Sequence, residues 1–239
     1  MTGGPEGAQG FVIDPPAIPS VAVEGSGRFP VRRIFCVGKN YAEHVREMGA
    51  DPRESPPVFF TKPADAVVES GAAIPYPPCT DNLHYEGELV LALKAGGRDI
   101  ASPQEAERLV FGYAAGCDLT RRDLQAAAKH AGAPWDAAKA FDRSAPLGAI
   151  ARKEGRPLGG DARLILSVNG EIRQDAALRE MIWSPAEILI ALSRLFELRP
   201  GDLVFTGTPA GVGPLVPGDR VEVRIGALPA LGFSILGAA

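Results

Sequence analysis

The stretch NLHYEGELVL (82–91) places two carboxylates, Glu86 and Glu88, two residues apart in a segment that alternates like a β-strand. Side chains at positions i and i+2 of a strand point to the same face, so these two acids lie side by side. Like charges on one face repel each other, and a bound cation would offset that repulsion. Solvation of both carboxylates at the surface is the alternative for the pair taken alone.

A third acid, Asp118, ends the apolar segment FGYAAGCD (111–118). Three carboxylates on neighbouring strand ends form the all-oxygen ligand set that Mg²⁺ or Mn²⁺ prefers, with water or substrate completing the coordination. His84 shares the face of Glu86, where it is either a partner that orients a ligand or a plain surface imidazole.

In DLTRRDLQ (118–125), a helix is predicted to start just after Asp118, and its first turns carry Arg122 and Gln125. These residues have the spacing i, i+3, so their side chains share one face of the helix. A guanidinium, an amide donor and a helix N-terminus together favour an anionic group bound beside Asp118. An exposed amphipathic helix with ordinary polar residues is the alternative.

His44 and Glu47 have the same i, i+3 spacing on a short helix that Asn40 can cap and Gly49 can end. A carboxylate beside an imidazole holds its tautomer and raises its basicity, which makes His44 a candidate general base for a water molecule. An ordinary surface pair of the two side chains is the alternative.

Two lysines and a glycine-rich loop complete the candidates. Lys62 in FFTKPADA and Lys139 in WDAAKAFD stand in apolar surroundings, and TGTPAGVG (206–213) presents Thr208, whose hydroxyl can contact a ligand. The loop lacks the Lys-Ser/Thr ending of a phosphate-binding loop and the spacing of a dinucleotide fingerprint. A tight turn after a strand is its alternative interpretation.

The elements that must position these residues are mostly strands. The 28 glycines and 22 prolines indicate many turns, which favours a sheet-rich fold over a helix bundle. Strands are predicted at 33–38, 58–62, 85–93, 111–118, 162–170, 202–207, 220–225 and 231–236. Helices are predicted at 103–110, from a capping box of Thr120 and Asp123 to about 130, and over SPAEILIALSRLFEL (184–198).

Turn residues dominate 132–148, which predicts no regular element there. Repeated Gly and Pro over residues 1–28 predict a surface arm, followed by a single folded domain over 29–239.

Composition excludes several classes of protein. A net charge of -4 without a long basic run gives no footprint for nucleic acid. No apolar run reaches the roughly 20 residues of a spanning helix, and the N-terminus lacks the features of a signal peptide. The three cysteines, widely spaced and odd in number, fit core positions in a reducing compartment. A cytoplasmic protein without a membrane partner is therefore expected.

Seven motifs, in this order, resemble the fumarylacetoacetate hydrolase family from about Phe29 onward: VGKNYAEHVREMG, FTKPADAVV, HYEGEL, GCDLTRRDLQ, KAFDRSAPLG, SVNGE and GDLVFTGTPAGVG. The resemblance implies an α+β fold, mainly β, of layered and rolled sheets with a few short helices. It also implies a homodimer with one divalent cation, Mg²⁺ or else Mn²⁺ or Ca²⁺, in each active site.

The resemblance also assigns roles to residues. It makes Glu86, Glu88 and Asp118 the metal ligands, His44 and Glu47 the catalytic dyad, and Arg122, Gln125 and Lys139 the groups that hold the substrate and its oxyanion, with Lys62 and Thr208 lining the site. Two positions depart from the family pattern: Lys39 stands where arginine is commoner, and Gly87 replaces a bulkier residue. A glycine at that position predicts a locally looser strand.

The activity implied is hydrolysis of a carbon–carbon bond in an acylpyruvate, a small 2-oxo acid, with fumarylpyruvate the expected substrate and fumarate and pyruvate the products. Cleavage of other acylpyruvates, decarboxylation of oxaloacetate and metal binding without catalysis are the alternatives. The last is disfavoured because a purely structural metal site needs neither the dyad nor Arg122, Gln125 and Lys139.

Overall fold

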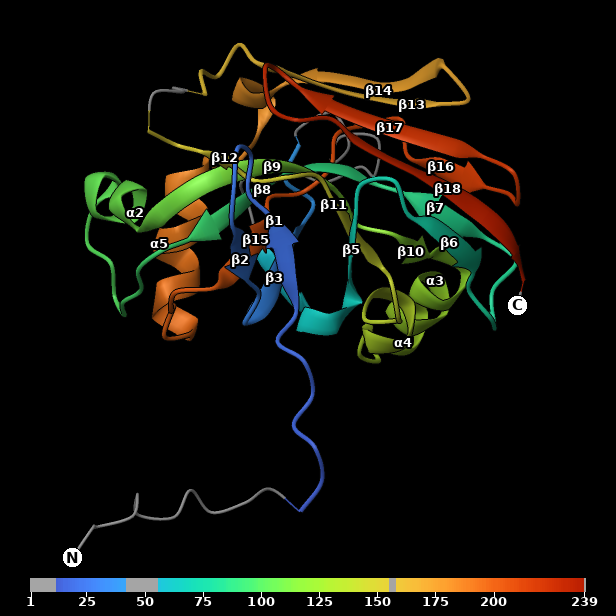
Figure 1. Ribbon diagram of the computed structural model, residues 1–239, viewed down its shortest axis with the longest axis horizontal. Coiled ribbons are helices and arrows are strands. Elements are labelled where there is room, and N and C mark those ends of the chain that lie inside the picture. Colours follow the sequence, from blue (N-terminus) through green and yellow to red (C-terminus); the bar gives the residue numbers. More distant parts are fainter. Residues whose placement is uncertain (1–11, 42–55, 155–157, 239) are drawn as a thin grey trace, which may run out of the picture.

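A curled, mixed β-sheet forms the centre of the computed structural model, which describes residues 12–41, 56–154 and 158–238 (Figure 1). Its eight strands run in the order β4-β3-β15-β8-β9-β11-β5, with β12 paired beside β9. Their bounds are β3 Arg33–Gly38, β4 Val58–Lys62, β5 Val67–Glu69, β8 Gly87–Leu93, β9 Val110–Cys117, β11 Ala145–Leu147, β12 Ala151–Arg152 and β15 Asp202–Phe205.

Both faces of this sheet are buried. Along β8, Leu89 and Leu91 belong to one hydrophobic core, whereas Val90 and Ala92 belong to a second core on the opposite face. All seven residues of β8 are buried, which is why the strand is an almost continuous apolar run rather than an alternating one. Glu88, on the face of Val90, is therefore held deep inside the protein.

A second sheet of five strands covers one face of the first, and Figure 1 shows it as the upper layer. Its order is β14-β13-β17-β18-β6, with bounds β6 Ala73–Tyr76, β13 Arg163–Val168, β14 Glu171–Ala177, β17 Arg220–Ile225 and β18 Leu231–Ala238. A three-stranded sheet joins β10 Thr120–Arg121, β7 Leu83–Tyr85 and β16 Gly213–Leu215.

Short helices flank the sheets on opposite sides (Figure 1). They are α2 Pro103–Leu109 and α5 Pro185–Leu195 on one side and α3 Arg122–Ala131 and α4 Asp136–Lys139 on the other, with 3₁₀ turns η1 Ala64–Ala66 and η2 Leu178–Glu180. The capping box predicted for α5 is present: the Ser184 hydroxyl accepts from the Glu187 N–H, and the Glu187 carboxylate accepts from the Ser184 N–H.

The predicted fold class, mainly β in layered and rolled sheets with few helices, is confirmed. Strands β3, β4 and β17 have the predicted bounds. The predicted strand 85–93 is instead interrupted at Glu86, between β7 and β8, and residues 132–148 contain α4 and β11. Strand β14 is not predicted by periodicity, although the Asn169–Gly170 turn before it, with both φ angles positive, is a hairpin signal.

The capping box predicted for Thr120 and Asp123 is wrong. Thr120 lies in β10, and its hydroxyl donates to the backbone carbonyl of Asp118. The Asp123 carboxylate accepts from the Thr80 hydroxyl and the Asp81 N–H. Thr120 cannot cap α3, because its backbone is paired with β7 as part of a strand. Both side chains instead form hydrogen bonds that hold neighbouring loops.

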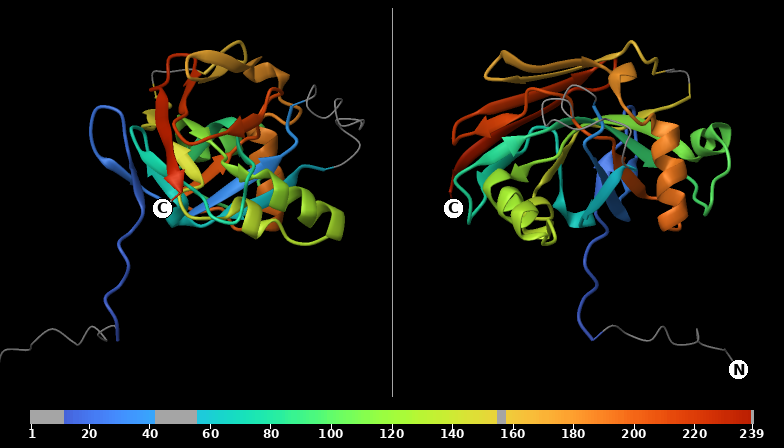
Figure 2. Two further views of the ribbon diagram at one scale, coloured as in Figure 1. Left: turned by 90° about the vertical axis from the view of Figure 1, so that its right-hand side faces the viewer. Right: turned by 180° about the vertical axis from the view of Figure 1, so that it is seen from behind.

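The last part of the N-terminal arm packs on the folded domain. Residues 12–19 extend away from the domain in all views (Figure 2). The hairpin of β1 Ser20–Ala22 and β2 Arg28–Pro30 then packs on it, with Val21 and Val23 buried in the second core. The burial of two valines explains why this part of the arm follows the surface of the domain.

The described cysteines are all unpaired thiols: Cys36 and Cys117 are buried as predicted, whereas Cys79 is exposed, because a Pro-rich turn carries it out of the core. Across the described ranges, no helix has both the length and the apolar character needed to span a membrane.

Candidate active site and metal centre

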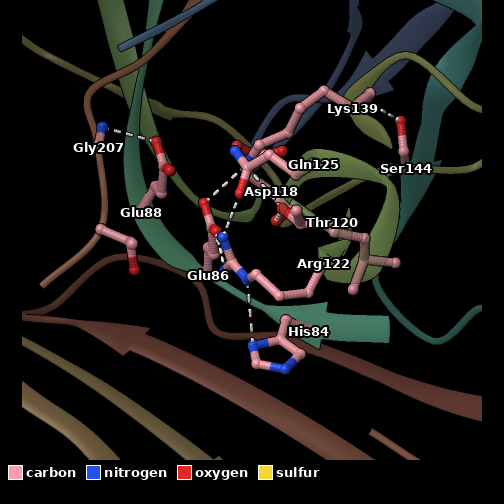
Figure 3. Close-up of polar contacts among 12 residues, drawn as sticks. His84, Glu86, Glu88, Asp118, Thr120, Arg122, Gln125, Lys139, Ser144 and Gly207 are labelled. Atoms are coloured by element: carbon pink, nitrogen blue, oxygen red, sulfur yellow. Dashed lines mark hydrogen bonds and ion pairs between the residues drawn. The ribbon is translucent and has the colours of Figure 1, made fainter. Parts of the chain in front are cut away.

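Three buried carboxylates converge where β8 and β9 begin and end. The antiparallel pairing sets Glu88 opposite Gly116, and the N–H of Asp118 donates to the carbonyl of Glu86 over 2.8 Å. One carboxylate oxygen from each of Glu86, Glu88 and Asp118 lies within 4.8 Å of the others. Figure 3 shows the side chains turned toward one another. The register of two strands has thus brought together acids that are 32 residues apart in the chain.

The donor set fits a hard divalent cation. Its ligand atoms are carboxylate oxygens alone, which Mg²⁺ and Mn²⁺ prefer. Burial raises the pKa of Glu88 well above its usual range, and the charges of Asp118 and Glu86 raise it further. One of its carboxylate oxygens, Oε2, accepts a hydrogen bond from the Gly207 N–H over 2.6 Å. No Lys or Arg of the described residues forms an ion pair with Glu88, and a metal ion at this point would contact it directly.

Two buried lysines neutralise the other two acids. The Lys139 ammonium lies 2.8 Å from Glu86 Oε2, 2.6 Å from Asp118 Oδ2 and 2.6 Å from the Thr120 hydroxyl. Lys62 Nζ lies 2.8 Å from Asp118 Oδ1. Burial alone would lower the pKa of Lys139, but the neighbouring charges of Asp118 and Glu86 raise it above its usual value. Lys139 is therefore charged, and the contacts with the acids hold both lysines in place.

Arg122 approaches the same centre from the first turn of α3. Its guanidinium bonds Glu86 Oε1, Gln125 Oε1 at 2.5 Å and His84 Nδ1 at 3.4 Å (Figure 3). Burial would raise the pKa of Glu86, but Lys139 and Arg122 lower it below its usual value, so this carboxylate is ionised. Arg122 and Gln125 thus share one face of α3, as their spacing predicts.

His84 is half-buried and belongs to this network. Desolvation and the charge of Arg122 lower the pKa of its imidazole to about 4, so the ring is neutral at pH 7. The hydrogen bonds match a neutral tautomer in which Nδ1 accepts from Arg122 and Nε2 donates to Asn82 Oδ1 over 2.8 Å. Of the two interpretations of His84, the structure favours a residue that orients Arg122.

The structure brings eight of the ten candidate residues together. Glu86, Arg122, Gln125, Lys139 and Thr208 line a small cavity of about 40 Å³ beside the acids. Glu88 and Asp118 lie behind its wall, and Lys62 contacts Asp118 from β4. The remaining two candidates, His44 and Glu47, lie outside the described residues, so the catalytic dyad stays a prediction.

Gly87 does not loosen its strand, contrary to the expectation from glycine at that position. Its N–H donates to Gln174 Oε1 over 2.9 Å, and its carbonyl accepts from the Thr208 hydroxyl over 2.9 Å. A Cβ at Gly87 would lie 3.0 Å from Leu166 Cδ1 and 3.2 Å from Gln174 Oε1. The second sheet therefore packs directly against the glycine and holds the backbone between the two glutamates.

Gln174 is a site residue that sequence reasoning missed. It is buried on β14, and its amide nitrogen donates to the Thr208 hydroxyl over 2.8 Å and to the Pro209 carbonyl over 2.9 Å. It thus connects Gly87, at the start of β8, to the loop at 206–213. A glutamine on the inward face of an alternating strand, two residues before the buried Ala176, is the signal that could have identified it.

The hydrogen bond to the Glu88 carboxylate depends on Gly207. This residue has φ +94°, and a Cβ on it would lie 2.6 Å from the Cβ of Asn40. Gly207→Ala is expected to destabilise the protein by about 1–3 kcal/mol and to weaken Mn²⁺ binding, because the backbone must shift away from Glu88.

Gly218→Ala is a matched control, since Gly218 has φ +97° but open space around its Cβ position. Urea unfolding and calorimetric Mn²⁺ titration of both variants separate two effects: the backbone strain of alanine at a positive φ, and the steric contact with Asn40. Equal losses in the two variants would contradict a specific role for the close approach at Gly207.

Comparison with known proteins agrees with this geometry. The family model described as the fumarylacetoacetate (FAA) hydrolase C-terminal domain matches residues 33–235, which include the whole described site. The chain belongs to the fumarylacetoacetate hydrolase family. Family members that are similar to the chain in sequence are enzymes, and their activities differ from one relative to another.

Three relatives illustrate that range. A fumarylpyruvate hydrolase of Ralstonia is 41% identical over 177 residues, 74% of this chain and 91% of the relative. An oxaloacetate tautomerase of Escherichia coli is 41% identical over 196 residues, 82% of this chain and 89% of the relative. The crystal structure of fumarylpyruvate hydrolase from Pseudomonas aeruginosa in complex with Mn²⁺ and pyruvate is 49% identical with a TM-score of 0.91, covering 95% of this chain and 99% of that one.

Proposed function

We propose that this family member is a divalent-metal-dependent hydrolase that converts fumarylpyruvate and water into fumarate and pyruvate. The observation that carries the proposal is the buried triad of Glu86, Glu88 and Asp118, surrounded by Lys62, Lys139 and Arg122. The similarity over nearly the whole chain to a fumarylpyruvate hydrolase that binds Mn²⁺ and pyruvate supports it.

The charges at the centre suit an anionic 2-oxo acid. Three cations, Lys62, Lys139 and Arg122, contact Glu86 and Asp118, and their charges equal those of the three carboxylates of the triad. A bound divalent ion would therefore give the centre two positive charges in excess. The carboxylate of a pyruvate group and the charge of its enolate would together balance that excess. When bound, the divalent cation would chelate the 2-oxo acid end and stabilise the enolate that leaves.

The residues of the chain would carry the remaining steps. His44, oriented by Glu47, would take a proton from water as its oxygen adds to the acyl carbonyl carbon. Arg122 and Gln125 would donate hydrogen bonds to the resulting oxyanion, and the charge of Lys139 would stabilise it, since all three residues line the cavity beside the acids. The bond between the acyl carbon and the pyruvate CH₂ then breaks, its electron pair passes to the enolate, and protonation of that carbon yields pyruvate.

Replacement of the general base tests this mechanism. His44→Ala is expected to lower kcat by a factor of about 10² to 10⁴ while Mn²⁺ affinity stays unchanged, because His44 is not a predicted metal ligand. His130→Ala, at an exposed position of α3, is the control and should retain full activity. An unchanged kcat in His44→Ala would contradict the dyad.

A second function is oxaloacetate tautomerisation, because relatives of equal identity are oxaloacetate tautomerases. That reaction moves a proton and uses the same enolate stabilisation, but it breaks no carbon–carbon bond. Decarboxylation of oxaloacetate, the alternative from the sequence, would release CO₂ instead.

One set of assays separates these functions. The purified protein, stripped with chelator and reloaded with Mg²⁺ or Mn²⁺, is given fumarylpyruvate, acetylpyruvate or oxaloacetate. Metal-dependent release of pyruvate and fumarate is expected. Interconversion of oxaloacetate tautomers without cleavage of either acylpyruvate would overturn the hydrolase proposal in favour of the tautomerase.

We also propose that the protein is a cytoplasmic homodimer that acts on small molecules rather than on nucleic acid or membranes. Light scattering after size exclusion tests the dimer, and fractionation of cells tests the compartment.

A further inference from the structure

Two lysines at the mouth of the active-site cavity have no acidic partner among the residues that the structure describes. Lys39 and Lys129 line the cavity together with Arg122, Lys139 and Glu86. Arg122 and Lys139 both bond Glu86, so the one acid of this wall is already shared between two inner cations. The two exposed lysines therefore leave positive charge on the wall of the cavity that its one acid does not balance.

The two lysines come from different elements and meet around Trp135. Lys129 Nζ lies 5.1 Å from the Trp135 ring centroid. Trp135 Cζ3 lies 3.7 Å from the position of a Cβ on Gly38, the residue before Lys39. Partial burial lowers the pKa of Lys129, and the charges of Arg122 and Lys39 lower it further, as expected for cations that share one cavity. A bound anion would relieve this repulsion.

Aromatic rings link the mouth to the inner site. Lys139 Nζ lies 5.0 Å from the Phe60 ring, and the Phe60 and Trp135 rings are 5.9 Å apart. The wall from Lys139 to Lys129 is thus apolar between two positive ends. A ligand that suits it has an anionic head at the metal centre, a flat unsaturated or aliphatic middle and a second anionic group at the far end.

We propose that Lys39 and Lys129 bind a second carboxylate at the acyl end of the substrate, which makes the enzyme selective for dicarboxylic over monocarboxylic acylpyruvates. This rests on the proposed function and names its substrate class. The 2-oxo acid end is balanced by the metal centre, so the second carboxylate is the charge left for the two lysines.

Unreactive 2-oxo acids test the subsite separately from turnover. The Mn²⁺-loaded protein is titrated calorimetrically with 2-oxoadipate and with 2-oxohexanoate, which have the same chain length but two carboxylates and one. Binding of 2-oxoadipate is expected to be about tenfold tighter, the usual scale for a hydrogen bond to a charged group. This preference should shrink as salt is raised.

Variants locate the effect. Lys129→Gln and Lys39→Gln should each reduce the preference several-fold, Lys129→Arg should keep it, and Lys94→Gln, a surface control paired with Glu154, should leave it unchanged. Glutamine has a helix propensity close to that of lysine, so α3 remains folded. With fumarylpyruvate, Lys129→Gln should raise KM about tenfold with little change in kcat, whereas KM for acetylpyruvate should not move.

The outcomes are distinct for the two proposals. If the wild-type protein prefers 2-oxoadipate but cleaves no acylpyruvate, the hydrolase function fails and the subsite stands. If it cleaves both acylpyruvates but binds the two 2-oxo acids alike, or if neither glutamine variant changes the preference, the subsite is overturned.

Discussion

Glu88→Gln is expected to abolish turnover and, at the same time, to stabilise the metal-free protein. The variant loses one of three carboxylate ligands, so its affinity for Mn²⁺ should fall by more than about 100-fold. In the metal-free protein, however, Glu88 is buried beside Asp118 and Glu86 and has no contacting cation among the described side chains. A neutral isostere removes that repulsion, which should raise the free energy of unfolding by about 1 kcal/mol or more.

The stabilisation should depend on pH with a definite sign. Because the pKa of Glu88 is raised in the folded state, its protonated form favours folding, and this contribution is fully present only below the pKa of the unfolded chain. It is lost as the pH rises toward the folded-state pKa. Glutamine imitates the protonated form at every pH, so the advantage of the variant should be small near pH 4 and grow toward pH 8.

Thermal unfolding after removal of metal, repeated from pH 4 to pH 8, measures this difference. Glu154→Gln is the control, since its side chain is 79% exposed and should change little. Added Mn²⁺ should raise the Tm of the wild-type protein and not that of Glu88→Gln. Loss of activity together with a less stable metal-free protein would contradict the role of Glu88 as an uncompensated ligand.

Lys139→Met is expected to have the opposite effect on stability. Lys139 bridges Glu86, Asp118 and Thr120, and its removal leaves two buried acids with fewer cationic contacts. Loss of one partner from a buried ion pair destabilises a protein by about 3–5 kcal/mol. Turnover should also fall by a factor of about 10² or more, because the variant lacks a positive charge beside the oxyanion.

Metal should partly rescue the stability of Lys139→Met but not its activity. A divalent cation between the acids replaces the lost positive charge, so Mn²⁺ should raise the Tm of this variant more than that of the wild-type protein. Lys94→Met, at an exposed ion pair, is the matched control. Equal shifts in the two proteins would contradict the interpretation of Lys139 as the counter-charge of the acids.

The strands that build the centre of the fold could be predicted from local pattern. RIFCVG, VFFTK and RVEVRI are short β-rich runs bounded by turn residues, and β3, β4 and β17 match them residue for residue. The break at Glu86 and the strand at 145–147 could not, because both arise from pairing with distant segments. Leu147 lies opposite Gly116, and Glu86 lies between β7 and β8, which belong to different sheets.

The sequence by itself determined which chemical groups are available here: two glutamates on one face of a strand, an acid at the end of an apolar run, and an arginine and glutamine at helical spacing. Those patterns follow from the 2.0 and 3.6 periods of strand and helix, which act over a few residues. They were enough to indicate a metal centre and an anion site.

Only the tertiary structure decided what surrounds these groups. Lys62 and Lys139 reach the acids from β4 and α4, and Gln174 from β14 bonds the backbone of Gly87 between the two glutamates, where the second sheet packs. These contacts join segments that no local period relates, because they depend on strand order and on the close approach of two sheets. The burial that raises the pKa of Glu88, and so creates its need for a cation, likewise exists only once both faces of the sheet are covered.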